Sequence, residues 1–390
     1  MFLKEEKIKR YLKDLKSSLN QKEIASGHLK KYPAKIKEKT LPDFSKLKGE
    51  DFKVGTKWGG KDISCWFRTQ INVPETWEIE PGNFYLKIIA GRGDSGNLKG
   101  SESLLYLNGK VIQGLDCKHS LVKLEKKELE NKNLEVVLKA FSGLKEGKQE
   151  FKKIALVYRN KNVEKYYYLA ETLYQSIKTM PSGNNLREKL LNILNNSLNI
   201  IDFRQVKSKK FLQTTASAYQ YLQESLAELN TEFNLPKITV VGHSHIDVAW
   251  LWKLLHTREK CSRSFSTVLK LMDEYPEYTF VQSSPQLYKF IKEDYPEIYA
   301  KIKEKIKEGK WEVTGGMWVE ADCNLTSGES LVRQFLHGHQ FIKDEFEIDW
   351  NILWLPDVFG YSWALPQIIK KSGMKYFMTT KISWNQFNSP

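Results

Sequence analysis

The chain has 390 residues, which is too long for one ordinary domain and enough for two or three. Hydrophobic residues make up 41% of it and charged residues 28%, which is typical of a globular protein with a sizeable core. The net charge is +14, but many lysines alternate with glutamates, as in KIKEKIKEGK at 301–310. This alternation indicates a solvated helix face, so we expect no nucleic-acid partner.

Targeting signals and paired cysteines are not evident in the sequence. No apolar run approaches the length of a membrane span, and no signal-peptide core follows the N-terminus. We therefore expect a cytoplasmic protein with no membrane partner. The four cysteines are widely spaced and form no CxxC motif, so neither a disulfide framework nor a cysteine zinc site is expected.

The N-terminal half predicts two kinds of structure. Residues 1–53 are rich in lysine and predict a helical and linker segment. Over 54–162 the apolar residues alternate, as in FYLKIIAGRG, SLLYLNGKVIQGLD, NLEVVLKAF and KIALVYR, which indicates strands. Asn108 and Gly109 favour a hairpin because both turn positions accept positive φ. An antiparallel β-sandwich is therefore predicted over 54–162.

The remaining chain divides into a helical part and a mixed part. Residues 163–236 carry apolar residues at spacings of three and four, which predicts a helical connector. From 237 to 390 short apolar strands, beginning with ITVV, alternate with amphipathic helices. Such alternation favours a parallel sheet or barrel, so the expected fold is multidomain, with a sandwich, a helical connector and an α/β domain.

Chemistry-bearing side chains follow the ends of two predicted strands. His243, His245 and Asp247 come after ITVV, and Asp357 comes after ILWLP. Loops at the carboxyl ends of parallel strands carry the active sites of α/β folds. His245 and Asp247 point the same way on an extended segment and form half of a divalent-metal site, to which Asp357 could add a third ligand. Three protein ligands with an open position describe a catalytic zinc site.

Simpler explanations exist for each of these residues. A His-x-Asp pair also arises by chance, and an aspartate at a strand end can cap the next helix. His243 is better explained as a hydrogen-bonded core histidine than as a ligand, and His256 is expected on a helix surface. Trp250 is either a core residue or, because it lies three positions after Asp247, a surface on which a sugar stacks.

Longer motifs then follow one another in a fixed order. They are WGGKDISCWFRTQINVPE, VVGHSHIDVAWLW, FVQSSPQLYKFI, GGMWVEADCNLTSGESLVRQFLHG, LWLPDVFGYSWALPQI and MTTKISWNQFN. With these motifs, which cover most of the chain after residue 54, the sequence resembles glycoside hydrolase family 38, the retaining α-mannosidases, and most closely the cytosolic and vacuolar branch. The resemblance implies that 237–390 is the N-terminal part of a (β/α) barrel catalytic domain, which is incomplete here.

The resemblance also implies a mechanism and a set of site residues. It implies hydrolysis of terminal α-D-mannosyl residues of oligosaccharides, with a metal-bound mannose and a covalent glycosyl-enzyme. His245 and Asp247 match the metal-ligand pair, and Asp357 matches the nucleophile, which also touches the metal. The implied metal is Zn²⁺, with Co²⁺ as the alternative. The implied substrate-binding residues are Trp250, Phe359 and Lys381.

The sequence departs from the family pattern after Asp357. The family requires a further histidine ligand and an acid/base carboxylate there, yet no His, Asp or Glu follows Asp357. We therefore expect an N-terminal portion of a longer enzyme, whose downstream remainder is a partner if the gene is split; homo-oligomer formation stays open. Two other functions also stay open. A metal-dependent carbohydrate deacetylase would release acetate, and a non-catalytic carbohydrate-binding protein would hold mannose without turnover.

Overall fold

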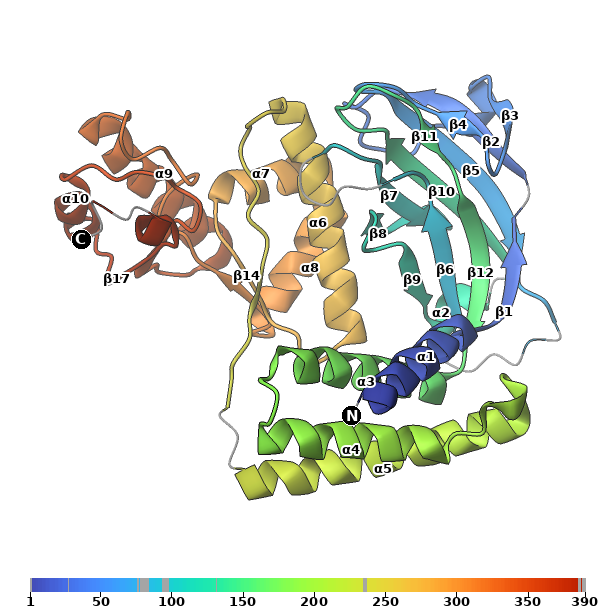
Figure 1. Cartoon of the computed structure of the whole chain (residues 1–390). Helices are drawn as coiled ribbons and strands as arrows, with labels where there is room; N and C mark the ends of the chain where they lie inside the picture. The colour runs from blue at the N-terminus through green and yellow to red at the C-terminus, as the bar shows by residue number, and fades with distance from the viewer. Residues whose placement is uncertain are drawn as a thin grey trace.

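The computed structural model places a β-sandwich on one side, a layer of helices beneath it and an α/β region on the other side (Figure 1). The long helix α6 (Leu254–Glu274) stands between the sandwich and the α/β region. The structure describes residues 2–26, 28–75, 77, 84–92, 98–130, 132–233, 237–384 and 387.

Two antiparallel sheets form the sandwich. The four-stranded sheet has the order β1 (Asn20–Ala25), β12 (Lys153–Arg159), β6 (Phe84–Ile89), β9 (Leu121–Leu124). The six-stranded sheet has the order β3 (Glu50–Lys53), β2 (His28–Ala34), β5 (Ser64–Asn72), β10 (Asn133–Phe141), β7 (Glu102–Leu107), β8 (Lys110–Leu115). The smaller elements are the ribbon β4 (Lys57–Trp58) and β11 (Gln149–Glu150), helix α2 (Lys126–Leu129) and the 3₁₀ turn η1 (Phe44–Lys46).

The N-terminal segment differs from its prediction. Residues 1–53 were expected as helix and linker, but only α1 (Phe2–Ser18) is a long helix there, and β1, β2 and β3 also come from this segment. The sandwich sheets therefore begin at Asn20 rather than at residue 54. In β2, Lys30 is exposed, Lys31 is half-buried and only Leu29 and Tyr32 are buried, so the high charge concealed the strand pattern.

The six-stranded sheet is buried on both faces. Along β7, Leu105 and Leu107 face the core between the two sheets. Leu104 and Tyr106 face the other way and share a second core with residues of α6. An antiparallel sheet with one face in water alternates apolar and polar residues, so the continuous apolar run of β7 reflects the helix that covers its outer face.

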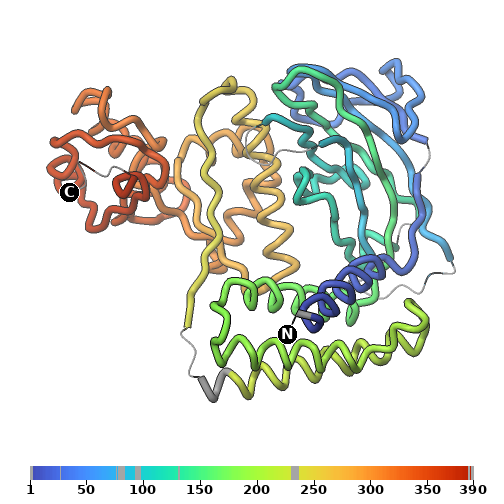
Figure 2. Tube along the Cα trace, in the orientation of Figure 1, coloured from blue at the N-terminus to red at the C-terminus, as the bar shows by residue number. Residues whose placement is uncertain are grey.

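The helical layer combines the predicted connector with the N-terminal helix. The connector expected over 163–236 appears as α3 (Lys161–Thr179), α4 (Asn185–Ile200), the 3₁₀ turn η2 (Phe203–Gln205) and α5 (Lys209–Phe233). In Figure 2 the N-terminal helix α1 lies against this layer, and its buried Ile8, Leu12 and Leu15 belong to the same core. The two segments are distant in sequence, so only tertiary packing brings them together.

The α/β region is built on short parallel strands in chain order. One group is β13 (Gly242–His243), β14 (Phe280–Gln282) and β15 (Trp311–Val313), and the other is β16 (Ile352–Trp354) and β17 (Tyr376–Met378). An isolated parallel bridge between Gly315 and Leu353 connects the groups. The intervening helices are α6, α7 (Pro285–Asp294), α8 (Pro296–Lys307), α9 (Gly328–Phe346) and α10 (Leu365–Lys371), and the 3₁₀ turn η3 (Lys381–Trp384) follows β17.

The first strand of this region is shorter than predicted. The run ITVV was expected to be a strand, but pairing with β14 involves only Gly242 and His243. The preceding residues extend beyond the end of β14, and the side chains of Ile238 and Val240 are 78% and 80% exposed. High β-propensity does not make a strand where no neighbouring strand offers hydrogen bonds.

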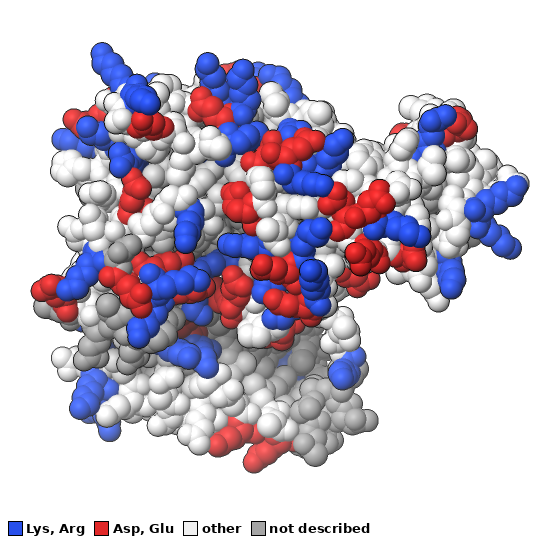
Figure 3. Space-filling model, turned by 180° about the vertical axis from the view of Figure 1, so that it is seen from behind, with Lys and Arg blue, Asp and Glu red and all other residues white. Residues whose placement is uncertain are grey.

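The surface carries charges of both signs. On the face shown in Figure 3, Lys and Arg side chains are intermixed with Asp and Glu rather than gathered into one basic area. Among the helices that the structure describes, none combines the length and the apolar character needed to cross a bilayer.

Candidate metal centre

The three predicted metal ligands converge in space. His245 and Asp247 lie in the loop after β13, and Asp357 lies in the loop after β16. One ligand atom from each residue lies within 4.8 Å of the other two. His245 Nε2 is 3.2 Å from Asp247 Oδ1 and 3.5 Å from Asp357 Oδ2. One imidazole nitrogen and two carboxylates form a donor set that suits Zn²⁺ or Co²⁺, so the residues fit a divalent ion.

A third carboxylate lies on the other side of the His245 ring. Glu320 Oε2 is 3.0 Å from His245 Nδ1, and Glu320 Oε1 accepts a hydrogen bond of 2.9 Å from Ser283 Oγ. Glu320, which lies in the loop after β15, is not among the residues predicted for the site. Only the fold brings the loop after β15 behind a residue that follows β13.

The charges around His245 favour its protonated form. Burial of the ring opposes a positive charge, but the neighbouring carboxylates of Asp247 and Glu320 outweigh this and raise the pKa of His245 to about 10. Such a site concentrates negative charge around one imidazole, and a divalent cation can balance that charge in place of the proton.

Lys381 lies beside the predicted nucleophile. Its Nζ is 2.7 Å from Asp357 Oδ1, and its side chain is only 9% exposed. The ammonium also sits 3.5 Å from the ring centre of Trp384 and 4.5 Å from that of Phe359. The sequence predicted a substrate contact for Lys381. In the structure its partner is Asp357, which it anchors through one carboxylate oxygen.

The other two predicted substrate contacts expose aromatic rings. Trp250 is 58% exposed and Phe359 is 73% exposed. Trp252 is buried instead, and its Nε1 donates a hydrogen bond of 3.1 Å to Thr257 Oγ1. The two tryptophans of the AWLW motif thus differ, because one completes the core and the other leaves a flat apolar surface open to a ligand.

His243 is not available as a metal ligand, because both of its ring nitrogens are engaged. His243 Nδ1 donates to the Val281 carbonyl at 2.9 Å, and its Nε2 accepts from Trp354 Nε1 at 3.4 Å. Burial lowers the pKa of His243, so the ring is neutral with both nitrogens engaged, as a core histidine should be.

The expectation for His256 was wrong. This residue is 2% exposed, and its Nε2 lies 2.7 Å from Asp62 Oδ1, while its Nδ1 accepts the Lys253 backbone N–H at 3.0 Å. A helix that packs against a second domain has no solvent face at that point, so His256 fastens the start of α6 to the sandwich.

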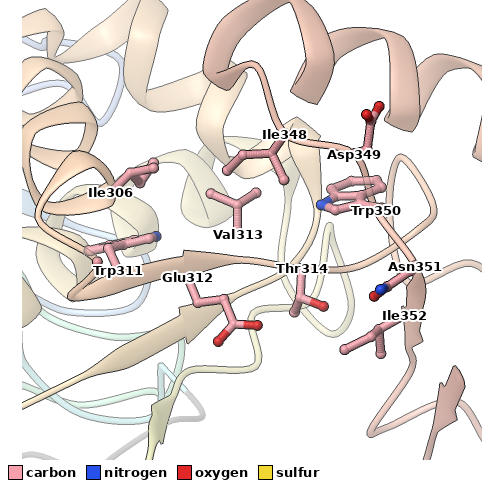
Figure 4. A pocket seen from close by; sticks show the side chains of 11 residues that line it. Ile306, Trp311, Glu312, Val313, Thr314, Ile348, Asp349, Trp350, Asn351 and Ile352 are labelled. Carbon is pink, nitrogen blue, oxygen red and sulfur yellow. The ribbon is translucent and has the colours of Figure 1, made fainter.

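A separate cavity lies at the opposite end of the strands. It has a volume of about 320 Å³ and is lined by residues of β15, by the start of β16 and by the segments that precede these strands (Figure 4). Trp311, Glu312 and Trp350 are among its lining residues. None of the residues that line it is a predicted site residue. The metal centre is therefore a cluster of loop side chains and is distinct from this cavity.

Comparison with known proteins matches both halves of the chain. Residues 235–389 match the glycosyl hydrolases family 38 N-terminal domain, and residues 27–172 match an alpha-mannosidase jelly roll domain. The second match agrees with the sandwich, including β2 and β3.

Several relatives are named α-mannosidases. Alpha-mannosidase G of Dictyostelium discoideum is 32% identical over 411 aligned positions, which cover 98% of this chain and 36% of the relative. Alpha-mannosidase 2C1 of Homo sapiens is 32% identical over 354, which cover 86% and 32%. Alpha-mannosidase of Saccharomyces cerevisiae is 46% identical over 156, which cover 40% and 14%. The chain thus spans about a third of the length of the first two.

Proposed function

The chain belongs to glycoside hydrolase family 38, and from this membership we propose that it carries the nucleophile and the metal ligands of a retaining α-mannosidase. The observation that supports the proposal most directly is the convergence of His245, Asp247 and Asp357 with Lys381. The proposed substrates are oligosaccharides with terminal α-D-mannosyl residues.

The proposed chemistry begins at Asp357. Lys381 pairs with Oδ1 and holds the carboxylate in place, and one carboxylate oxygen of Asp357 attacks the anomeric carbon of mannose. As the bond from this oxygen to the anomeric carbon forms, the glycosidic bond breaks and its oxygen departs with a proton from an acid. Water then attacks the same carbon, gives a proton to the conjugate base of that acid and breaks the bond to Asp357, which releases mannose with retained configuration and regenerates the carboxylate.

The other site residues would bind and orient the sugar. A bound Zn²⁺ or Co²⁺ would be held by His245, Asp247 and Asp357 and would supply Lewis-acid contacts to sugar hydroxyl oxygens. Trp250 and Phe359 would receive the apolar face of the ring. Because both aromatic rings are exposed, the sugar can reach them without displacing core residues.

The arrangement of the strands and the state of the cysteines bear on the fold and on the cellular location of the protein. We infer that β13 to β17 are consecutive strands of the family's (β/α) barrel over 237–390, which their parallel, chain-order arrangement supports. We also propose a cytoplasmic location. All four cysteines are unpaired, as is usual in a reducing compartment.

The test uses an activated sugar that does not need the acid. An α-mannosyl fluoride with a second fluorine at C5 has a leaving group that departs without protonation and forms a slowly hydrolysed glycosyl-enzyme. We expect the purified chain, loaded with Zn²⁺, to gain one fluoromannosyl group, and peptide mapping by mass spectrometry should locate it on Asp357. Chelator should reduce the rate of labelling.

Matched variants make this test specific. Asp357→Asn should abolish labelling, whereas Asp322→Asn should retain it, because the Asp322 side chain accepts hydrogen bonds within its own turn. Labelling of a different carboxylate, or no labelling, would contradict the proposed nucleophile. Release of acetate from an N-acetylated sugar without mannosyl transfer would favour the deacetylase, and mannose binding with no label would favour a binding protein.

A further inference from the structure

We propose that Glu320 is a positioning residue that orients the His245 ring and fixes its proton on Nδ1, so that Nε2 is presented to the metal. This inference rests on the proposed function. Glu320 Oε2 lies 3.0 Å from His245 Nδ1, on the side of the ring away from Asp247 and Asp357. The imidazole therefore has one nitrogen for the carboxylate behind it and one for the ligand cluster in front of it.

The other half of the Glu320 carboxylate is held in place. Its side chain is 9% exposed, and its Oε1 accepts from Ser283, which is 1% exposed in the loop after β14. The backbone just before Glu320 is anchored to α9, since the Trp318 and Val319 N–H groups donate to Gln334 at 2.9 and 3.0 Å. The Ser283 hydrogen bond therefore holds the Glu320 side chain, and the contacts with α9 hold the backbone that precedes it.

No other polar group in the described part of the chain bonds to either of the two facing atoms, His245 Nδ1 and Glu320 Oε2. His245 Nδ1 and Glu320 Oε2 are both buried, and neither atom has a hydrogen-bond partner in the part of the chain that the structure describes. Their 3.0 Å separation is that of a charge-assisted pair, although the angle is more bent than in a straight hydrogen bond. A buried polar atom left alone is costly, so each atom favours the orientation that faces the other.

The position of Glu320 argues against two other roles. As a fourth ligand it would need to lie with the three clustered donor atoms, but within the described ranges that cluster contains only His245, Asp247 and Asp357. As the acid it would need to reach the sugar, but it lies behind the imidazole and is mostly buried. Carboxylates that accept from the distal nitrogen of a metal-bound histidine set its tautomer and raise its basicity.

The test measures the binding of Zn²⁺ and does not depend on turnover. We expect Glu320→Gln to weaken Zn²⁺ binding by about 10- to 100-fold in competition with a chromophoric chelator, because an amide is a weaker and less directional acceptor than a carboxylate. Ser283→Ala should weaken binding by about 3- to 10-fold, because it frees only one oxygen of Glu320. Glu312→Gln, an exposed carboxylate on β15, removes the same charge and should leave Kd unchanged.

A second readout separates positioning from stability. Long-range ¹H–¹⁵N spectra of the Zn²⁺ form should show His245 protonated at Nδ1 in the wild type and altered at that nitrogen in Glu320→Gln. The unfolding temperatures of the metal-free proteins should show that each variant is folded.

The outcomes distinguish this inference from the proposed function. Weaker binding in His245→Ala together with an unchanged Kd and spectrum in Glu320→Gln would overturn the inference alone. No Zn²⁺ binding by the wild type would overturn both. Weaker binding in Glu320→Gln with an altered Nδ1 signal would support both.

Discussion

Single side chains in this protein have roles that depend on their exposure. Trp250 and Trp252 are two positions apart, yet one ring is 58% exposed and the other 7%. We predict that Trp250→Ala weakens binding of an α-mannoside about 10-fold, or about 1.4 kcal/mol, because the sugar loses its stacking surface. The free energy of unfolding should change by no more than about 0.5 kcal/mol. Calorimetric titration and urea denaturation measure the two quantities.

Trp252→Ala should have its main effect on the free energy of unfolding, in contrast to Trp250→Ala. It removes a buried ring and leaves Thr257 Oγ1 without its indole donor, so it should lower the free energy of unfolding by about 3–5 kcal/mol. If Trp250→Ala left mannoside affinity unchanged, the exposed ring would not be a sugar contact.

At the scale of elements, α9 and the loop after β15 approach each other closely. A Cβ on Gly338 of α9 would lie 2.8 Å from the Met317 carbonyl carbon and 2.9 Å from the Trp318 nitrogen, and both are backbone atoms. We predict that Gly338→Ala lowers the free energy of unfolding by about 1–3 kcal/mol through overpacking. It should also weaken Zn²⁺ binding, since the displaced loop carries Glu320.

The control for this prediction lies in the same helix. A Cβ on Gly328 meets no atom within 4 Å, so Gly328→Ala should be neutral or stabilising by about 0.5–1 kcal/mol. Urea denaturation with and without Zn²⁺ measures both effects. Equal stability of the two variants would show that α9 and the loop can separate at no cost.

At the scale of the whole molecule, buried ion pairs join the sandwich to the α/β region. Lys139 on β10 is 3.0 Å from Glu259 on α6, and their side chains are 3% and 6% exposed. Lys39 pairs with the same carboxylate. Burial lowers the pKa of Lys139, and Glu259 partly offsets this effect. Each of these buried charges would be costly alone, and the interface accommodates them because Lys139 and Lys39 are paired with Glu259.

We predict that Glu259→Gln lowers the free energy of unfolding by about 3–5 kcal/mol, because it leaves Lys139 buried without its counter-charge. The sandwich and the α/β region should then unfold in separate calorimetric transitions. Glu329→Gln breaks an exposed pair with Arg333 on α9 and should cost no more than about 0.5 kcal/mol. A single unshifted transition in Glu259→Gln would contradict the assigned role of this pair.

The sequence by itself was sufficient for those features that local patterns encode. Alternating apolar residues predicted the strands between 54 and 162, helical spacing predicted the connector, and the ordered motifs predicted family 38, which the comparisons confirm. The pairing of His245 with Asp247 followed from the alternation of side chains along an extended segment. The roles of Trp250, Phe359 and Lys381 in substrate binding stay predictions.

Only the tertiary structure decided which distant groups meet. It placed Glu320 behind His245, Lys381 on Asp357 and His256 against the sandwich, and it added β1, β2 and β3 to the sheets. It also made the first parallel strand begin only at Gly242, opposite the first residue of its neighbour. The physical reason is that periodicity and propensity report on a residue and its near neighbours. Burial, ion pairing and strand pairing depend instead on segments that approach only when the chain folds.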